Sequence, residues 1–506
     1  MKQATKFSWL SAMLSITLQA ALMVTIPAQA DPSSDCADLT SMFVEDTTIT
    51  SASITPPAGA LPEHCRVVGY VDTEINFELR MPTDWNRKFY HRGQGGLVGT
   101  IGEFGPGLSR GYAEVATDTG HVGRPPFPEL DGFWALDRPD REINYGFRAI
   151  HVVTVAAKAI TEEYYEDEIA YSYFEGCSNG GRQGLMEAQR FPEDFDGIVA
   201  GAPVVDYTGL ALGWTWNLQA LASAPNLWTK LPALDATSMA ACDSEDGLED
   251  GLIRDQGRCA FDPSVLTCPY GEDTPACLTE AEVEAVQKVL AGPSNSWGEQ
   301  LYRGVHQGAE NGWFGWITGP VGLPTFQALL VTEFHRYLLF DDPLYNPLNF
   351  DFDSDVAALE ATGDFLNATD PDLSAFKANN GKLIMWHGWS DPAVVAGRTI
   401  QYYHDVIRET GGNKHRVREF SRLFLVPGML HCLGGSGPNQ FDALGALEDW
   451  VENGNAPDQI IASGVSGQTQ PLCAYPEVAV YKRGDPSDAT SFTCKNRGLG
   501  YSLKGF

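Results

Sequence analysis

Apolar and polar positions alternate in several short stretches of the first part of the chain. In INFELRMP, residues 75–82, apolar side chains recur at every second position, which is the period of a β-strand. Four further stretches are interpreted as strands: KFYHRG, YAEVATDTGH, IAYSYFEG and FDGIVAGAP. YGFRAIHVVTVAAKAITEEYY, which is Ala-rich and free of glycine after Gly146, predicts a helix, and GRQGLMEAQRF predicts another. This alternation is typical of an α/β fold with a mostly parallel sheet.

The character of the chain changes after Pro203. Residues 204–380 are loop-rich, contain four of the ten cysteines and concentrate aromatic side chains in LGWTWN, NGWFGWITG and FHRYLLF. Regular alternation resumes at GKLIMWHGWSDPAVV and SRLFLVPGMLHC, each of which predicts a strand followed by a loop. We therefore predict a catalytic domain in two parts, 31–203 and 381–506, with a lid domain inserted between them.

The stretch YFEGCSNGGRQG contains two adjacent candidate nucleophiles, Cys177 and Ser178. Its GCSNG frame matches G-x-S-x-G, in which the glycines let a serine sit exposed on a strained turn between a strand and a helix. This motif predicts Ser178 as the nucleophile, so Cys177 needs another role.

Two later strands each deliver a residue that completes a catalytic set. Asp391 follows the first strand and His431 follows the second, which gives the order Ser, Asp, His found in α/β hydrolases. We expect His431 to remove the Ser178 proton during attack on an ester carbonyl, while Asp391 orients the imidazole. Asp405 is the alternative acid, but its stretch YYHDVIRE has a helical pattern.

An oxyanion hole must accompany such a set, since it stabilises the tetrahedral intermediate. The backbone N–H of Asn179, directly after the nucleophile, is the first predicted donor. The second is expected in the glycine-rich stretch RGQGGLVG, from Gly95 or Gly96, because a residue without a side chain lets the backbone approach the substrate.

The N-terminus has the pattern of an export signal. Lys2 and Lys6 precede an apolar run that ends in Ala28-Gln29-Ala30, the small-x-small pattern of a signal-peptidase site. A transmembrane anchor is the alternative, but polar residues interrupt the run and the cleavage pattern follows it. We predict that residues 1–30 are a signal peptide and that the mature chain is secreted or periplasmic.

All ten cysteines lie in the mature part, and an even number in an exported protein favours disulfides. Cys177 and Cys432 remain once eight cysteines are grouped into short-range couples, although spacing alone proves no pairing. A bridge between these two would hold their Cα atoms within about 4.4 to 6.8 Å and place the His431 imidazole beside the Ser178 hydroxyl. The short-range couples are Cys36 with Cys65, Cys242 with Cys259, Cys268 with Cys277, and Cys473 with Cys494.

An acidic stretch in the predicted lid, CDSEDGLEDGLIRD, brings Asp243, Asp246 and Asp250 together. Hard carboxylate oxygens on tight glycine turns suit Ca²⁺ better than Zn²⁺ or copper. The stretch does not match the EF-hand template, and an acidic surface turn is the alternative.

The overall charge excludes two classes of partner. The chain has 34 Lys and Arg against 66 Asp and Glu, a net charge of −32, which becomes −34 when Lys2 and Lys6 leave with the signal. A protein with this net charge repels nucleic acid and anionic membranes. We therefore expect neither as a partner.

Taken together, these motifs resemble the tannase and feruloyl esterase family, a group of secreted α/β hydrolases that includes mono(2-hydroxyethyl) terephthalate hydrolases. The resemblance extends over nearly all of the mature chain and rests on GCSNGGRQG, WHGWSDP, PGMLHC, YGFRAIHVVT, FPEDFDGIVAGAP and CDSEDGLEDGLI. It implies a disulfide between the cysteines beside Ser178 and His431, and it supports the four other pairings. It also implies a structural calcium ion held by Asp243, Asp246, Asp250 and the carbonyls of Leu248 and Leu252.

The resemblance implies esters of aromatic acids, such as ferulate or gallate, as small-molecule substrates. Arg303 and Arg336 are candidates to bind the carboxylate of a terephthalate half-ester, which is the alternative substrate. A non-catalytic, calcium-stabilised binding protein is a further alternative, but a complete catalytic set argues against it. No feature calls for a peptidase. Five aromatic residues of the lid are candidates to stack on the acyl group: Trp214, Trp216, Trp313, Phe314 and Trp316.

Overall fold

The computed structural model describes residues 32–102, 104–254, 256–308 and 310–496. The predicted signal peptide, residues 1–30, lies outside these ranges. Among the helices that are described, none has the length and the apolar content needed to cross a membrane.

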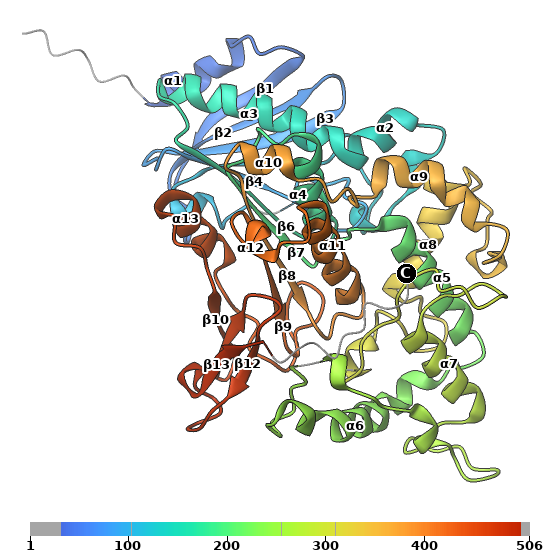
Figure 1. Cartoon of the computed structure of the whole chain (residues 1–506). Coiled ribbons are helices and arrows are strands. Elements are labelled where there is room, and N and C mark those ends of the chain that lie inside the picture. Colours follow the sequence, from blue (N-terminus) through green and yellow to red (C-terminus); the bar gives the residue numbers. More distant parts are fainter. Residues whose placement is uncertain (1–31, 103, 255, 309, 497–506) are drawn as a thin grey trace, which may run out of the picture.

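A nine-stranded sheet forms the centre of the molecule, with the strand order β1-β2-β3-β5-β4-β6-β7-β8-β9 (Figure 1). The five pairs from β5 to β9 are parallel, and the three pairs that join β1, β2, β3 and β5 are antiparallel. The predicted mostly parallel sheet of an α/β hydrolase is therefore confirmed. The strands are β1 Thr47–Thr55, β2 His64–Val71, β3 Ile75–Pro82, β4 Lys88–Arg92, β5 Ala113–Thr117, β6 Tyr171–Cys177, β7 Gly197–Gly201, β8 Lys382–Gly388 and β9 Ser421–Val426.

Helices cover both faces of this sheet, so its central strands are buried on both sides. Tyr173 and Phe174 are neighbours on β6, yet they belong to two different hydrophobic clusters, as expected of side chains that alternate between faces. Phe174 packs in the cluster that contains residues of α3, α4 and α11, whereas Tyr173 packs in the cluster that contains residues of α13. These helices are α3 Ala149–Tyr165, α4 Asn179–Arg190, α11 Ala396–Glu409 and α13 Ala443–Asn453.

The segment between β7 and β8 corresponds to the stretch predicted to be inserted. Its described part contains helices and no strand, and most of its buried apolar side chains join one hydrophobic cluster, which also includes residues from both flanking parts of the chain. In Figure 1 most of it lies beside the carboxyl ends of the central strands, whereas its last helix, Ser374–Ala378, lies against α4. Its helices are α5 Tyr207–Leu221, α6 Leu231–Cys242, α7 Glu280–Ala291, α8 Phe326–Glu333, α9 Leu359–Leu366 and α10 Ser374–Ala378.

Smaller elements complete the fold. A π-helical turn, Asn144–Arg148, leads into α3, so the predicted helix begins with a wider turn than an α-helix has. The short helices are α1 Pro32–Asp38, α2 Pro139–Ile143 and α12 Lys414–Val417. Near the C-terminus, two antiparallel pairs are formed by β10 Gln459–Ser463 with β11 Thr469–Cys473, and by β12 Val478–Tyr481 with β13 Phe492–Lys495.

All ten cysteines form disulfides, and the five pairs are those proposed from the sequence. Disulfides persist in oxidising compartments outside the cytoplasm. Four bridges close short segments, whereas Cys177–Cys432 joins positions 255 residues apart.

Candidate active site

Ser178 lies on the sharp turn between β6 and α4. Its backbone has φ 65° and ψ −124°, a conformation that a residue with a side chain rarely adopts. Glycines on both sides make the turn possible, because a Cβ on Gly176 would lie 2.6 Å from the Gly180 carbonyl carbon, and a Cβ on Gly180 would lie 2.8 Å from that of Gly93. The G-x-S-x-G pattern thus has a local steric cause.

The structure brings Ser178, His431 and Asp391 together. Ser178 Oγ lies 3.0 Å from His431 Nε2, and His431 Nδ1 lies 2.7 Å from Asp391 Oδ2. Because a carboxylate only accepts hydrogen bonds, Nδ1 carries the imidazole proton, and Nε2 is left to accept the proton of the serine hydroxyl. This geometry allows general-base activation of Ser178.

Asp391 is fixed on both of its oxygens. Oδ1 accepts hydrogen bonds from the backbone N–H groups of Ala393 and Val394 at 2.8 and 2.9 Å, and His387 Nε2 lies 3.3 Å from Oδ2. Burial alone would raise the pKa of Asp391, but the charge of His431 and the hydrogen bonds from His387 and His431 outweigh it, so the pKa lies well below its ordinary value. The carboxylate is therefore held in its ionised form.

The alternative acid, Asp405, lies on α11 and has other partners. It forms ion pairs with Arg408 and, at 3.9 Å, with Arg398. His431 receives its carboxylate contact from Asp391.

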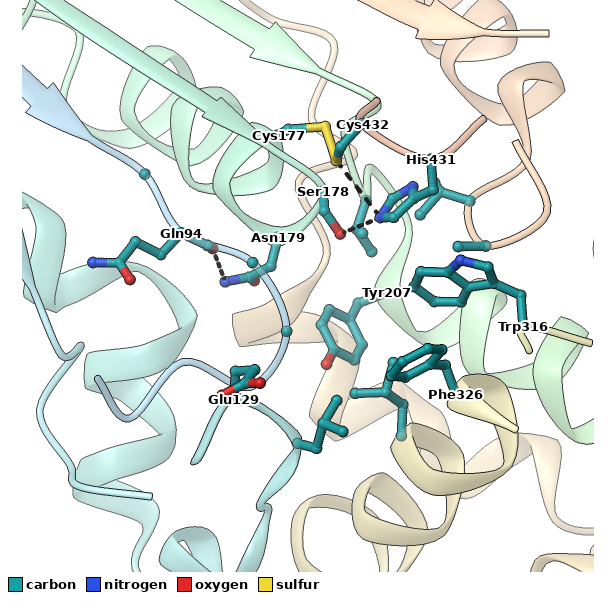
Figure 2. A pocket seen from close by; sticks show the side chains of 18 of the residues that line it. Gln94, Glu129, Cys177, Ser178, Asn179, Tyr207, Trp316, Phe326, His431 and Cys432 are labelled. Carbon is teal, nitrogen blue, oxygen red and sulfur yellow. Dashed lines mark hydrogen bonds between the residues drawn. A yellow bond between two sulfur atoms is a disulfide. The ribbon is translucent and has the colours of Figure 1, made fainter. Parts of the chain in front are cut away.

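The Cys177–Cys432 disulfide connects the residue before Ser178 to the residue after His431, with the two Cα atoms 5.9 Å apart. Strands β6 and β9 are not neighbours, because β7 and β8 lie between them. The loop after β9 must therefore cross the ends of two strands to reach Ser178, and the disulfide holds it there (Figure 2).

The loop after β4 lies beside the nucleophile. A Cβ on Gly95 would lie 3.9 Å from Ser178 Cβ. The N–H groups of Gly93 and Leu97 donate to carbonyls, whereas those of Gly95 and Gly96 donate to no acceptor in the part of the chain that is described. Asn179 begins α4, where a backbone N–H has no partner within the helix.

Sequence reasoning missed the side chains that position this loop. Asn179 donates from Nδ2 to the Gln94 carbonyl at 3.0 Å, and Gln183 accepts from the Gln94 N–H at 3.0 Å. Arg182, fully buried, donates from Nε to Asn179 Oδ1 at 2.8 Å and also to backbone carbonyls. In the sequence, only the GGRQG motif after the nucleophile indicated these contacts.

A cavity of about 590 Å³ opens in front of Ser178 (Figure 2). Of the five aromatic residues predicted to contact substrate, Trp214 and Trp316 line it. The Trp316 ring stands edge-on to the His431 imidazole, with centroids 5.1 Å apart. Other lining residues had no sequence signal and include Thr100, Glu129, Leu130, Val204, Tyr207, Phe326 and Leu330.

The other predicted substrate contacts lie elsewhere. Trp313 is buried and Trp216 donates from Nε1 to the Lys288 carbonyl, while Phe314 is about half exposed. Arg336 donates from Nε to the Tyr345 carbonyl, and Arg303 lines a separate cavity of about 10 Å³. These side chains pack or form hydrogen bonds within the segment between β7 and β8. Their aromatic or charged character alone therefore does not predict whether they line the cavity.

The predicted calcium loop contains a cation of its own. The Arg254 guanidinium lies 2.6 Å from Asp250 Oδ2 and 3.4 Å from Asp246 Oδ2, and it donates to the Leu252 carbonyl at 3.4 Å. Asp243 accepts backbone N–H groups of the same loop. Within the described ranges, the three aspartates do not bring one oxygen each within 4.8 Å of the other two. In this arrangement the residues do not fit a calcium ion, and calcium binding stays a prediction.

The mostly parallel sheet, the strained serine turn and the Ser–His–Asp arrangement define an enzyme of the α/β-hydrolase class. A sequence model described as tannase and feruloyl esterase matches residues 60–495. The chain therefore belongs to the tannase and feruloyl esterase family, and it is a carboxylic ester hydrolase of that type.

Known proteins agree with this assignment. The chain is 35% identical to an uncharacterised esterase of Xanthomonas campestris pv. campestris, with 92% of each chain covered. It is 36% identical to the mono(2-hydroxyethyl) terephthalate hydrolase of Piscinibacter sakaiensis, with 88% of this chain and 87% of the relative covered. The crystal structure of feruloyl esterase B from Aspergillus oryzae superposes with a TM-score of 0.84 at 25% identity, covering 92% of this chain and all of the other.

Proposed function

We propose that the protein is an exported serine esterase that cleaves esters of phenolic acids, such as ferulate or gallate, through an acyl-enzyme on Ser178. One observation carries the proposal. Ser178 Oγ lies 3.0 Å from His431 Nε2, whose ring is oriented by Asp391 at 2.7 Å, at the wall of a cavity large enough for an aromatic acid.

In this mechanism, Ser178 Oγ attacks the ester carbonyl carbon while His431 Nε2 takes the hydroxyl proton. The N–H groups of Asn179 and of Gly95 or Gly96 donate to the oxyanion that forms. Gly95 is the preferred second donor because a Cβ on it would lie 3.9 Å from Ser178 Cβ, whereas the atoms nearest to a Cβ on Gly96 belong to Glu129. The intermediate collapses, His431 gives its proton to the leaving alcohol, and water activated by His431 then hydrolyses the acyl-enzyme.

The cavity lining supports a phenolic acyl group. Tyr207, Trp316 and Phe326 offer aromatic surface for a ring, as Figure 2 shows. Glu129 is the only Asp or Glu, and Arg92 the only Lys or Arg, among the described lining residues. A carboxylate accepts a hydrogen bond from a phenolic hydroxyl and repels a second carboxylate.

A terephthalate half-ester is the second candidate substrate, and the 36% identity to a mono(2-hydroxyethyl) terephthalate hydrolase favours it. Its free carboxylate requires a cation in the acyl pocket. Arg92 is the one described lining residue that offers a cation, since Arg303 and Arg336 do not line the cavity. Glu129 in the same lining would repel that carboxylate, so the phenolic ester is preferred.

Export is the second part of the proposal. Disulfides form in oxidising compartments, and this chain has five of them. The pattern of residues 1–30 supplies a signal peptide that would take the chain there.

The proposal is tested by trapping the acyl group. Purified protein is mixed with methyl ferulate, methyl gallate or mono(2-hydroxyethyl) terephthalate, and both turnover and the mass of acid-quenched peptides are measured. We expect turnover of a phenolic ester and the acyl mass on the peptide that contains Ser178. Turnover without any acylated Ser178 peptide would count against the proposed mechanism. No turnover of the three esters would count against the proposed acyl class.

Glu129→Gln is expected to lower kcat/KM for methyl caffeate and methyl gallate by about 10- to 100-fold, since hydrogen bonds to charged groups contribute about 1.5 to 3 kcal/mol. Methyl cinnamate, which has no phenolic hydroxyl, is the matched substrate and should react at an unchanged rate. An equal loss on methyl cinnamate would show that Glu129 supports the cavity and does not select the hydroxyl.

A further inference from the structure

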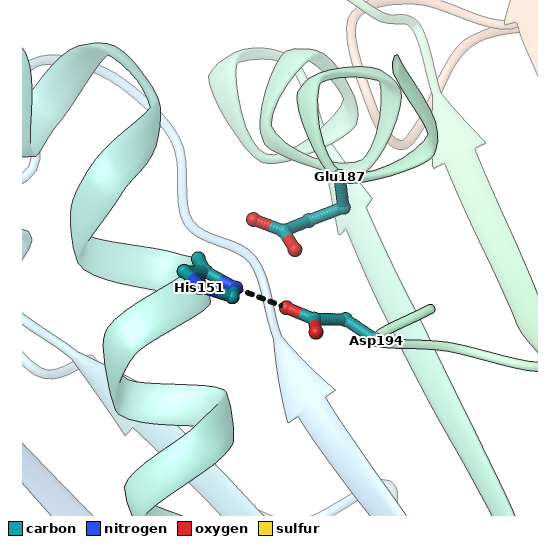
Figure 3. Close-up of side chains that lie close together, drawn as sticks. All are labelled: His151, Glu187 and Asp194. Atoms are coloured by element: carbon teal, nitrogen blue, oxygen red, sulfur yellow. Dashed lines mark hydrogen bonds and ion pairs between the residues drawn. The ribbon is translucent and has the colours of Figure 1, made fainter. Parts of the chain in front are cut away.

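Three ionisable side chains converge between α3 and α4, apart from the cavity in front of Ser178. His151 projects from α3, Glu187 from α4, and Asp194 from the loop that follows α4 (Figure 3). One nitrogen or oxygen from each residue lies within 4.8 Å of those of the other two. Glu187 lies nine residues after Ser178, about 13 Å along α4, and none of the three lines the active-site cavity.

Glu187 is the unusual member of this cluster. It is 1% exposed, and neither of its carboxylate oxygens has a hydrogen-bond partner in the described structure. In Figure 3 its carboxylate points toward His151 and Asp194. Burial and the neighbouring charge of Asp194 raise the pKa of Glu187 well above its ordinary range. A buried carboxylate beside another one is destabilised unless a cation or a proton compensates its charge.

His151 supplies a nitrogen ligand that is already oriented. Its Nδ1 lies 2.7 Å from Asp194 Oδ2, and its ring stacks on Phe191 with centroids 3.9 Å apart and planes 5° apart. The side chain is 31% exposed, so an ion can reach the cluster from solvent.

The ammonium group of Lys158, a neighbouring cation, has hydrogen-bond partners other than Glu187. Lys158 Nζ donates to Ser172 Oγ at 3.0 Å and to the backbone carbonyl of Asp194. Its ammonium therefore neutralises part of the local charge while it leaves the Glu187 oxygens without a donor. Asp196 and Glu162 also contribute negative charge near Lys158.

We propose that His151, Glu187 and Asp194 bind a divalent metal ion of the Zn²⁺ type. One imidazole nitrogen and two carboxylate oxygens form a ligand set that Zn²⁺ accepts, with a water molecule completing four-coordination. Ca²⁺ takes six to eight oxygen ligands, so a cluster with an imidazole nitrogen and only two carboxylates favours Zn²⁺ over Ca²⁺. The ion connects α3 to α4, the helix that begins at the nucleophile turn, and its role is structural.

The test uses the mature protein after removal of metals with a chelator. On addition of zinc chloride we expect close to one zinc ion per chain by elemental analysis after desalting. With calcium chloride present in every sample, zinc should raise the melting temperature by about 3 to 6 °C at a hundredfold excess over Kd. Zinc that dissociates on desalting with no change in melting temperature would overturn the proposal.

Matched variants distinguish a bound metal ion from a proton that Glu187 shares with Asp194. Glu187→Gln keeps the size of the side chain but removes a ligand, so it should lose the bound zinc and its effect on melting; His151→Gln should do the same. Glu193→Gln removes an exposed charge next to the cluster and should still bind zinc. If wild type binds no zinc and the chelator-treated Glu187→Gln is at least as stable, Glu187 is simply protonated against Asp194 and no metal site exists.

Discussion

Asp391→Asn is expected to lower kcat on the preferred ester by about 10⁴-fold with little change in KM, because comparable substitutions in serine hydrolases remove that much. The backbone N–H groups of Ala393 and Val394 would keep the amide oxygen where Oδ1 now lies. The amide nitrogen would then face His431 Nδ1 and donate to it. His431 would then adopt the tautomer that carries its proton on Nε2, so Nε2 could no longer accept the proton of Ser178.

The matched control is Asp405→Asn, which removes the alternative acid from α11. Its ion pairs are with Arg398 and Arg408, so kcat should stay within about twofold of wild type and only stability should change, by less than about 1 kcal/mol. Steady-state kinetics on both variants, with melting curves to show that each is folded, decide the question. A large loss of kcat in Asp405→Asn and a small one in Asp391→Asn would reverse the assignment.

The central sheet could be predicted because parallel strands leave a strong pattern. Strands β4 to β9, which form the parallel pairs, were predicted from short apolar stretches, whereas β3, antiparallel to both of its neighbours, was predicted from its period-2 alternation. Chain order then placed Asp391 and His431 after strands whose carboxyl ends share one edge with Ser178. Each prediction used only a local sequence pattern, and the parallel sheet brings the three residues together.

The lining of the cavity could not be predicted in the same way. Glu129 lies in a short 3₁₀ helix, Pro128–Leu130, before α2, and Tyr207 and Phe326 begin helices α5 and α8 of the segment between β7 and β8. Whether an aromatic residue lines a cavity or fills a core depends on how helices pack, and no short-range pattern records this. Trp313 and Trp316 are three residues apart, yet one is buried and the other contacts His431.

The contacts of the acidic loop could not be predicted either, for a different reason. Spacing identified Asp243, Asp246 and Asp250 as close neighbours, but it did not show that Arg254 folds back onto two of them. Glu187 had no signal either, since a glutamate on an amphipathic helix is ordinarily exposed. In the acidic loop and at Glu187 alike, a charged residue elsewhere in the chain determines which group the carboxylates bind.

Replacing Cys177 and Cys432 together by alanine is expected to lower kcat at least about 100-fold and to destabilise the fold by about 2 to 5 kcal/mol. The stability loss follows from removing a bridge across 255 residues. The loss of kcat follows from the path of the chain, because the loop that carries His431 crosses the ends of β7 and β8 before it reaches Ser178. An imidazole displaced by about 1 Å no longer accepts the serine proton efficiently. Activity is measured at a temperature where the variant is fully folded.

The control removes Cys268 and Cys277, whose bridge spans nine residues and lies away from the cavity lining. A shorter loop restricts the unfolded chain less, so this variant should lose less stability and keep its kcat. The comparison separates positioning from stabilisation, since both variants lose a disulfide but only one loses the tether on His431. If the Cys177 and Cys432 variant keeps its kcat while its melting temperature falls, the hydrogen bonds of Asp391 are sufficient to hold His431, and the disulfide serves stability alone.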